Sequence, residues 1–262
     1  MEKELIVSDR CIGCGLCAKV CIRGHLALGA DRRIHEVESQ YSCFRCGHCL
    51  AVCPKDAIRL RRFASESPAE ASAPVDAGSL MMLYRQRHSH RWFDRKCSAD
   101  EIERMISSTR YSPTAENSQA MEFAVVDARF DEFMRLCASI LRTHTDEHPR
   151  LRQFVDYVES GMEGRNNPFT WEGRQVIIAF SRLPIDSAIA MEQMELMAFS
   201  MGLGGFHSRW ILQASENDPD AFMSFFPEIR EDLTASAAFV VGHPRMEYKR
   251  TSPREGRTII WK

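Results

Sequence analysis

Eight of the ten cysteines in this 262-residue chain stand in two runs of identical spacing, and this constrains the fold more than any other feature. Each run reads C-x2-C-x2-C-x3-C, and each cysteine of the first run has a counterpart 32 positions later. A constant offset over four positions indicates two copies of one structural unit. The first run comprises Cys11, Cys14, Cys17 and Cys21, and the second comprises Cys43, Cys46, Cys49 and Cys53.

This spacing predicts two 4Fe-4S clusters. Three thiolates separated by two residues can surround one corner of a cuboidal cluster, while the fourth, which we expect to begin a helix, points to the other cluster. We therefore expect Cys53 to complete the cluster of the first run and Cys21 that of the second. Glycines between the cysteines would let backbone N–H groups approach the sulfurs, and apolar neighbours would exclude water. Pro54 predicts a helix start after Cys53.

Zinc and disulfides are the alternative uses of these cysteines. Structural zinc sites usually pair two C-x2-C knuckles across a longer spacer, and four closely spaced thiolates do not easily surround one small ion. Disulfides are typical of secreted chains, and the amino-terminal sequence has no basic segment followed by an apolar core. Cys97 and Cys137 lie outside the runs, and we expect both to be reduced thiols.

Length and composition favour two domains, with a small cysteine-rich domain at residues 1–60, a linker at 61–78 and a larger domain at 79–262. The first domain has few large apolar side chains, so we expect its clusters to supply most of its folding free energy. The linker is rich in Ser, Ala, Glu and Pro. The net charge of −2 gives no indication of a nucleic-acid partner, and no apolar run reaches membrane-spanning length, so we expect a cytoplasmic protein.

The larger domain has mixed α and β patterns. Ser98 and Glu101 form a capping box ahead of a helix, and helical spacing recurs in three further segments. Short apolar runs predict buried strands, and a methionine stripe predicts core packing. The further helices are expected at 130–141, 151–162 and 188–201, the strands at 123–126, 176–180 and 237–241, and the stripe at Met191, Met194, Met197 and Met201.

Two polar segments of this domain are candidates for ligand binding. Near residues 83–93, Arg85, Arg87 and Arg91 could grip a phosphate, because a guanidinium offers paired donors to two phosphate oxygens. A solvated basic helix end is the alternative, and His88 with His90 would make a weaker metal site. The loop at 112–119 carries amide and hydroxyl groups that suit a polar ring.

These segments, with the glycine turn at 202–205, resemble the nitroreductase family of FMN enzymes over residues 80–262. Residues 1–60 resemble a bacterial two-cluster ferredoxin, although Ile22 replaces the usual proline. The resemblance implies an α+β fold, in which a ferredoxin-like two-cluster domain precedes a nitroreductase-like α+β domain with a central, mainly antiparallel sheet flanked by helices. It also implies FMN binding by Arg87, His88, Ser89, Arg91, Pro113, Thr114, Asn117, Gln119, Gly204, Gly205 and Arg254, with Arg257 as the rival of Arg254.

The resemblance further implies a homodimer with FMN at the subunit interface and a carboxy-terminal arm, residues 258–261, that adds a strand to the partner's sheet. Ala120 and Met121 stand where many relatives have Pro-Trp, so the resemblance does not define the roof of the pocket or the choice of substrate. A Rossmann dinucleotide loop is the alternative for residues 202–205. It fits poorly, because the turn follows a helix and His207 occupies the third glycine position.

We therefore expect an iron–sulfur flavoprotein oxidoreductase, in which single electrons from an external low-potential donor such as a ferredoxin pass through the clusters to FMN. The acceptor would be a small nitroaromatic or quinone-type molecule. Because water can supply the proton, we assign no catalytic acid or base. The alternatives are a protein that delivers electrons to a protein partner, and a specialised enzyme of the family such as a reductive dehalogenase.

Overall fold

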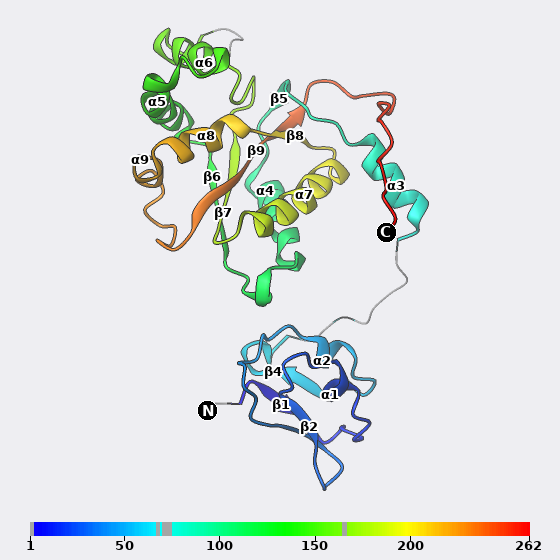
Figure 1. Cartoon of the computed structure of the whole chain (residues 1–262). Coiled ribbons are helices and arrows are strands. Elements are labelled where there is room, and N and C mark those ends of the chain that lie inside the picture. The colour runs from blue at the N-terminus through cyan, green and yellow to red at the C-terminus, as the bar shows by residue number, and fades with distance from the viewer. Residues whose placement is uncertain (1–2, 67–68, 70–74, 164–166) are drawn as a thin grey trace. The chain divides into compact units, whose positions relative to one another are not determined.

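The structure is a computed structural model that describes residues 3–66, 69, 75–163 and 167–262 (Figure 1). It forms two compact units, residues 1–74 with 116–118, and residues 75–115 with 119–262. Most of the central part of the predicted linker, 67–68 and 70–74, lies outside the described residues. At the edges of that linker, residues 61–63 form a short 3-10 turn and helix α3 begins at Ala77.

The N-terminal unit contains two antiparallel strand pairs, β1 with β4 and β2 with β3. Six residues that come mainly from these strands form its small apolar core. The expected contribution of the cysteine sites to the stability of this unit stays a prediction. The strands are β1 (Leu5–Val7), β2 (Leu26–Leu28), β3 (Ile34–Glu36) and β4 (Ile58–Leu60).

The backbone of this unit repeats with the same offset of 32 as the cysteines. Helices α1 (Leu16–Val20) and α2 (His48–Ala51) each begin after a left-handed glycine, Gly15 with φ 76° and Gly47 with φ 77°. The left-handed conformation of Gly24, with φ 66°, recurs 32 positions later although a side chain is present there. The two cysteine runs therefore share a backbone conformation as well as a spacing.

The helix positions correct two expectations. The third cysteine of each run, Cys17 or Cys49, lies in the helix, and the fourth follows the helix end. Pro54 does not begin a helix, because the chain turns there, with the Asp56 N–H donating to the Cys53 carbonyl at 3.2 Å, and then enters β4. The glycine caps start each helix earlier than we expected.

The C-terminal unit is built on a five-stranded sheet in the order β5-β9-β7-β6, with β8 also paired to β9. All of these pairings are antiparallel, which confirms the predicted sheet. The long strand β9 pairs with three other strands, β5, β7 and β8. The strands are β5 (Phe93–Arg95), β6 (Met121–Val126), β7 (Val176–Ser181), β8 (Gly204–His207) and β9 (Thr234–Pro244).

Successive residues of a strand point to opposite faces of the sheet, and in the central strands both sets are apolar. Helices cover both faces of the sheet (Figure 1). Ile178 and Phe180 of β7 pack on one face with helices between residues 130 and 223, whereas Ile177 and Ala179 pack on the other face with the helices at Ala99–Ser108 and Pro184–Ser200. Every residue of β7 is buried, as expected for a strand covered on both faces. The sheet is thus the middle of three layers.

The helices agree with most of the sequence expectations. The capping box of Ser98 and Glu101 is present at the start of α4. Met191 and Met194 are buried in α7, whereas Met197 is more exposed than predicted. The helices are α3 (Ala77–Gln86), α4 (Ala99–Ser108), α5 (Phe130–Leu141), α6 (Pro149–Glu159), α7 (Pro184–Ser200), α8 (Arg209–Asn217) and α9 (Pro219–Met223).

The carboxy-terminal segment 258–261 forms no strand within the described chain. Its apolar side chains Ile259, Ile260 and Trp261 are exposed, Trp261 by 89%. The addition of this segment to a partner's sheet stays a prediction. Among the described residues, no helix is both long enough and apolar enough to cross a membrane.

Candidate functional site

Three cysteines of the second run and one of the first line a single cavity in the N-terminal unit. Cys43, Cys46 and Cys49 line it together with Cys21, and apolar side chains such as Phe44 and Leu26 complete much of the wall. Burial, with smaller contributions from the charges of Cys43 and Cys46, raises the pKa of Cys49 to about 12. A bound cation would be needed to hold such a thiol as a thiolate.

Cys14 and Cys17 of the first run form a second group with Cys53 in the same unit. Burial raises the pKa of Cys17, and the nearby charges of Cys53 and Cys14 raise it further. Cys17 therefore lies near a cysteine of the second run. All ten cysteines lie in the described part of the chain and each is a free thiol, which excludes the disulfide alternative in this structure.

Backbone N–H groups point at sulfur atoms of both groups. The His25 N–H donates to Cys21 Sγ at 3.3 Å, and the Ala57 N–H donates to Cys53 Sγ at 3.3 Å, 32 positions later. In the second run, the Arg45 N–H donates to Cys43 Sγ at 3.3 Å. Such N–H···S contacts stabilise negative sulfur, so the sulfur donors and their surroundings fit 4Fe-4S clusters.

In the C-terminal unit, Arg87 is held by a buried acid that the sequence did not single out. Arg87 ends helix α3, and its Nη1 donates to Glu195 Oε1 of α7 at 3.0 Å. The other oxygen of Glu195 contacts His207 Nε2 at 3.1 Å. Burial alone would raise the pKa of Glu195, but the hydrogen bonds and charges of His207 and Arg87 together hold it below its ordinary value.

His88 is fixed by three contacts. Its Nδ1 lies 2.7 Å from the Gln86 carbonyl, which can only accept, so Nδ1 carries the proton. Its Nε2 then accepts from Ser252 Oγ at 2.9 Å in the neutral ring. The ring also stacks on Tyr248 at 4.5 Å between centroids. Tyr248 and Ser252 thereby connect the chain after β9 to the predicted FMN-binding segment.

The next residues run beside the glycine turn. Ser89 forms a parallel bridge to Gly205, and the His90 N–H donates to the Gly205 carbonyl at 2.9 Å. A Cβ on Gly204 would lie 2.6 Å from the His90 ring, and one on Gly205 would lie 2.2 Å from the Val240 carbonyl oxygen. Close packing between neighbouring segments therefore explains both glycines, and their predicted FMN contact stays a prediction.

Arg91 contacts two aromatic rings. Its guanidinium lies over the ring of Phe206 at 5.3 Å and that of Trp171 at 5.9 Å. Arg254 is exposed, and its guanidinium contacts the carbonyl of the neighbouring Pro253 at 3.1 Å. Arg87, His88 and Ser89 are consecutive and each has a different partner, and the predicted role of Arg254 at the phosphate stays a prediction.

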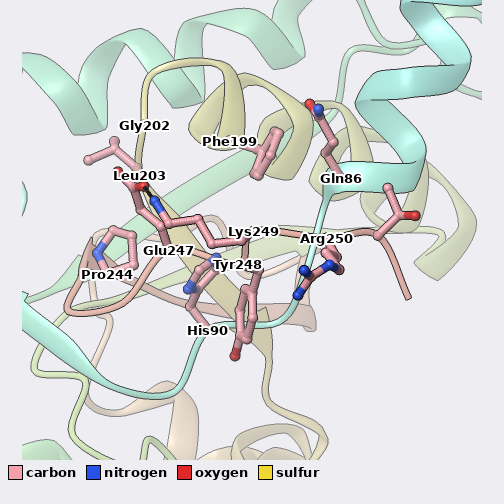
Figure 2. A pocket seen from close by; sticks show the side chains of 11 residues that line it. Gln86, His90, Phe199, Gly202, Leu203, Pro244, Glu247, Tyr248, Lys249 and Arg250 are labelled. Atoms are coloured by element: carbon pink, nitrogen blue, oxygen red, sulfur yellow. Dashed lines mark hydrogen bonds and ion pairs between the residues drawn. The ribbon is translucent and has the colours of Figure 1, made fainter. Parts of the chain in front are cut away.

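A cavity of about 370 Å³ opens beside the glycine turn (Figure 2). Figure 2 shows His90 and Tyr248 close together, with Arg250 and Gln86 also on the wall. Burial lowers the pKa of His90, so this ring favours its neutral form. Tyr248, Lys249 and Arg250 were not predicted from the sequence, although the basic pair Lys249-Arg250 precedes the predicted Arg254 by only a few positions.

The loop at 113–119 belongs to a different cavity, of about 340 Å³. Thr114 and Gln119 line this cavity, and Thr114 Oγ1 accepts from the Gln119 N–H at 3.0 Å. Asn117 and Gln119 have left-handed backbones, with φ of 52° and 49°. Pro113 precedes Thr114 in this loop. Thr114 and Gln119 are thus predicted FMN residues that line a cavity, whereas the cavity beside the glycine turn is lined by sequence neighbours of the other predicted residues, such as Gln86, His90 and Leu203.

Comparison with known proteins first defines the class. A nitroreductase with bound FMN from Desulfitobacterium hafniense has a TM-score of 0.54 at 16% identity, covering 70% of this chain and 97% of that one. A nitroreductase with bound FMN from Bacteroides fragilis has a TM-score of 0.55 at 18% identity, covering 70% and 98%. The C-terminal unit thus has the fold of these proteins.

The family follows from the sequence matches. Residues 84–243 match the Nitroreductase family, and residues 5–60 match the 4Fe-4S dicluster domain. The chain belongs to the nitroreductase family and carries an N-terminal dicluster domain.

Two curated relatives match the cysteine-rich unit alone. An uncharacterized ferredoxin from Methanocaldococcus jannaschii is 36% identical over 64 residues, covering 23% of this chain and 82% of that protein. One component of an ion-translocating oxidoreductase complex from Methanosarcina acetivorans is 43% identical over 51 residues, covering 20% of this chain and 18% of that protein. The match therefore spans less than a fifth of the latter.

Proposed function

We propose that this protein is an iron–sulfur flavoprotein oxidoreductase that uses electrons from a low-potential donor, such as a ferredoxin, to reduce a small nitroaromatic or quinone-type acceptor. The observation that carries the proposal is the presence of two cysteine groups and a nitroreductase domain in one chain. When bound, 4Fe-4S clusters exchange single electrons, and FMN can collect two and deliver them together. Such a chain can couple a one-electron donor to a two-electron reduction.

We infer that the cysteine groups are the cluster ligands in the crossed arrangement. The second-run cluster would be held by Cys43, Cys46, Cys49 and Cys21, which share a cavity. The first-run cluster would be held by Cys11, Cys14, Cys17 and Cys53. Support for this second set comes from the electrostatic effect of Cys14 and Cys53 on Cys17.

The residues of the C-terminal unit fit FMN as well. The cavity beside the glycine turn has aromatic and cationic side chains, including Tyr248 and Arg250, which suit a flat ring and a phosphate. Arg87 uses Nη1 for Glu195, and its other guanidinium donors can serve the phosphate. His88, Ser89, Arg91, the backbone of Gly204 and Gly205, and Arg254 complete the predicted binding set.

The remaining predicted contacts would come from a second copy of the chain. Pro113, Thr114, Asn117 and Gln119 lie on the loop that lines a separate cavity, so a homodimer would bring this loop to the partner's FMN. Exposed apolar side chains on α3, on α7 and in the carboxy-terminal segment could cover the interface. They include Leu80, Met81, Met82, Tyr84, Ile185, Ile189, Ile259, Ile260 and Trp261.

The chain's own groups orient the flavin and acceptor, exclude water and supply charge. The buried Glu195 holds Arg87 at the end of α3, and the contact with Ser252 holds the His88 ring in place. The described residues therefore provide a positioned guanidinium at Arg87 and a fixed imidazole ring at His88. Water can supply the proton that the reduced acceptor needs.

The test combines cofactor analysis with turnover. Anaerobically purified protein should contain two 4Fe-4S clusters by iron and sulfide content, and FMN by extraction. In stopped flow with reduced ferredoxin, the cluster absorbance should change before the flavin bleaches, and nitroaromatics or quinones should saturate turnover. An absence of saturable turnover with a panel of nitro, quinone and halogenated acceptors would contradict reduction of a small molecule.

A further inference from the structure

A buried histidine faces the cavity of the second cysteine group. His25 is 8% exposed and lines this cavity with Cys21 and Cys43. Its Nε2 is enclosed and has no hydrogen-bond partner in the part of the chain that the structure describes. An enclosed polar atom without a partner is unfavourable, so a partner inside the cavity would remove this cost.

A second donor lies on the same wall. Arg23 Nε is also enclosed, and among the described residues it has no hydrogen-bond partner. The guanidinium lies over the ring of Phe44 at 3.6 Å and over that of Tyr41 at 4.6 Å, which fixes its position. Its Nη2 pairs with the exposed Glu116 Oε1 at 3.2 Å, and its permanent positive charge lies at the wall of the cavity.

The first cysteine group lacks both features. The 32-residue repeat places Ala57 where the second group has His25, and Lys55 where it has Arg23. Both His25 and Ala57 make the same backbone N–H···S contact of 3.3 Å, but the methyl group of Ala57 cannot donate. Lys55 is exposed to solvent. The two cysteine groups therefore share a backbone and differ in side-chain donors.

We propose that His25 and Arg23 raise the reduction potential of the cluster held by Cys21, Cys43, Cys46 and Cys49 above that of the other cluster. His25 donates from Nε2 to a sulfur in the cavity, and Arg23 adds a hydrogen bond and a positive charge. Both favour the more negative, reduced state. This inference rests on the proposed ligand assignment. It predicts that the first electron reduces the cluster held by Cys21, Cys43, Cys46 and Cys49.

The test is a redox titration of the full-length protein followed by EPR. The wild type should show two separate one-electron steps. His25→Ala, which copies the residue at position 57, should lower only the higher potential, by about 59 mV, since this corresponds to a roughly tenfold change in electron distribution between the clusters. His25→Gln, which keeps an N–H donor, should restore part of the shift, and Arg23→Gln should lower the same step.

Lys55→Gln is the matched control, because it removes a charge at the equivalent position outside the cavity, and it should leave the higher step unchanged. Cys46→Ala should abolish the step that His25→Ala moves. If both steps shift together, or the higher step stays in place in His25→Ala, the inference is wrong. If His25→Ala loses iron, an unchanged higher step in Arg23→Gln overturns it. Wild-type protein without two clusters by iron and sulfide content would instead overturn the proposed function.

Discussion

Glu195 shows how a single residue can organise the predicted flavin site. It lies among Met191, Met194 and Ala198 on the buried side of α7, and its side chain is 5% exposed. A buried carboxylate is tolerated only when it is paired, and here Arg87 and His207 provide the partners. Glu195 therefore positions Arg87, the residue that we expect to meet the FMN phosphate.

Replacement of Glu195 by Gln should lower the free energy of unfolding of the C-terminal unit by about 3 kcal/mol, because Arg87 would lose its buried charge partner. Since the folded-state pKa of Glu195 lies below its ordinary value of 4.5, the carboxylate's stabilising contribution is present above pH 4.5 and is lost as pH falls through the folded-state pKa. Glu195→Gln should therefore show a weaker loss of stability in acid. Tryptophan fluorescence can follow this, because all four tryptophans lie beyond residue 90.

Glu247→Gln is a suitable control for this prediction. It also breaks an ion pair, with Lys249 at 2.7 Å, but both side chains are exposed, so stability should change little. Equal losses of free energy of unfolding in the two variants would contradict the prediction that the buried Glu195 pair stabilises the protein more than an exposed ion pair.

Site residues could be predicted from the sequence where the pattern that reveals them is local, and not where the two partners lie far apart along the chain. The cysteines could be recognised from sequence because their spacing is local and repeats. The pair of Arg87 and Glu195 spans 108 positions, so no local pattern reveals it. One signal was available, because Glu195 interrupts an apolar helical face and a buried acid requires a partner. Gly204 and Gly205 were recognised as important, but their close packing needed the strand pairing.

At the scale of elements, the crossed ligand arrangement yields a reciprocal test. Cys53→Ala should eliminate the same cluster signal as Cys14→Ala, and Cys21→Ala the same signal as Cys46→Ala. The reason is that each fourth cysteine lies beyond the end of its own helix and near the other run's group.

EPR of the reduced variants measures this without a prior assignment of the two signals. Each of the four variants serves as a control for the others, and iron content checks that one cluster remains. The crossed arrangement would be rejected if Cys53→Ala matched Cys46→Ala instead of Cys14→Ala.

Helices and strands with strong periodicity were predicted well, but their ends were not. The sequence range 130–141 matches α5 because an amphipathic pattern fills the whole helix. By contrast, β9 extends from Thr234 to Pro244 because three different strands pair along it, and that extension cannot be read from its short apolar run. The helix expected at Pro54 failed because an early turn leads directly into β4.

At the scale of the whole molecule, the sequence resemblance predicted two modules, and the structure gives each its own core. The core residues of the C-terminal unit all lie between Phe93 and Val241, whereas those of the N-terminal unit lie between Leu5 and Leu60. The structure of a single chain does not test the predicted dimer. An interface would be indicated there only by exposed apolar side chains such as Trp261.

Deletion of residues 1–60 should leave a folded protein that binds FMN but no longer turns over with reduced ferredoxin. The separate cores account for the folding, and the loss of the eight cysteines of the two runs accounts for the loss of electron entry. In the full chain, covalent attachment keeps donor and acceptor at an effective concentration on the order of millimolar, so transfer need not await collision. The measurement is anaerobic turnover with reduced ferredoxin, with a chemical reductant of FMN as the control that should drive both proteins equally. The proposal fails if the truncated protein accepts electrons from ferredoxin as fast as the full chain, or if NADH or NADPH reduces FMN in the full chain far faster than the clusters do.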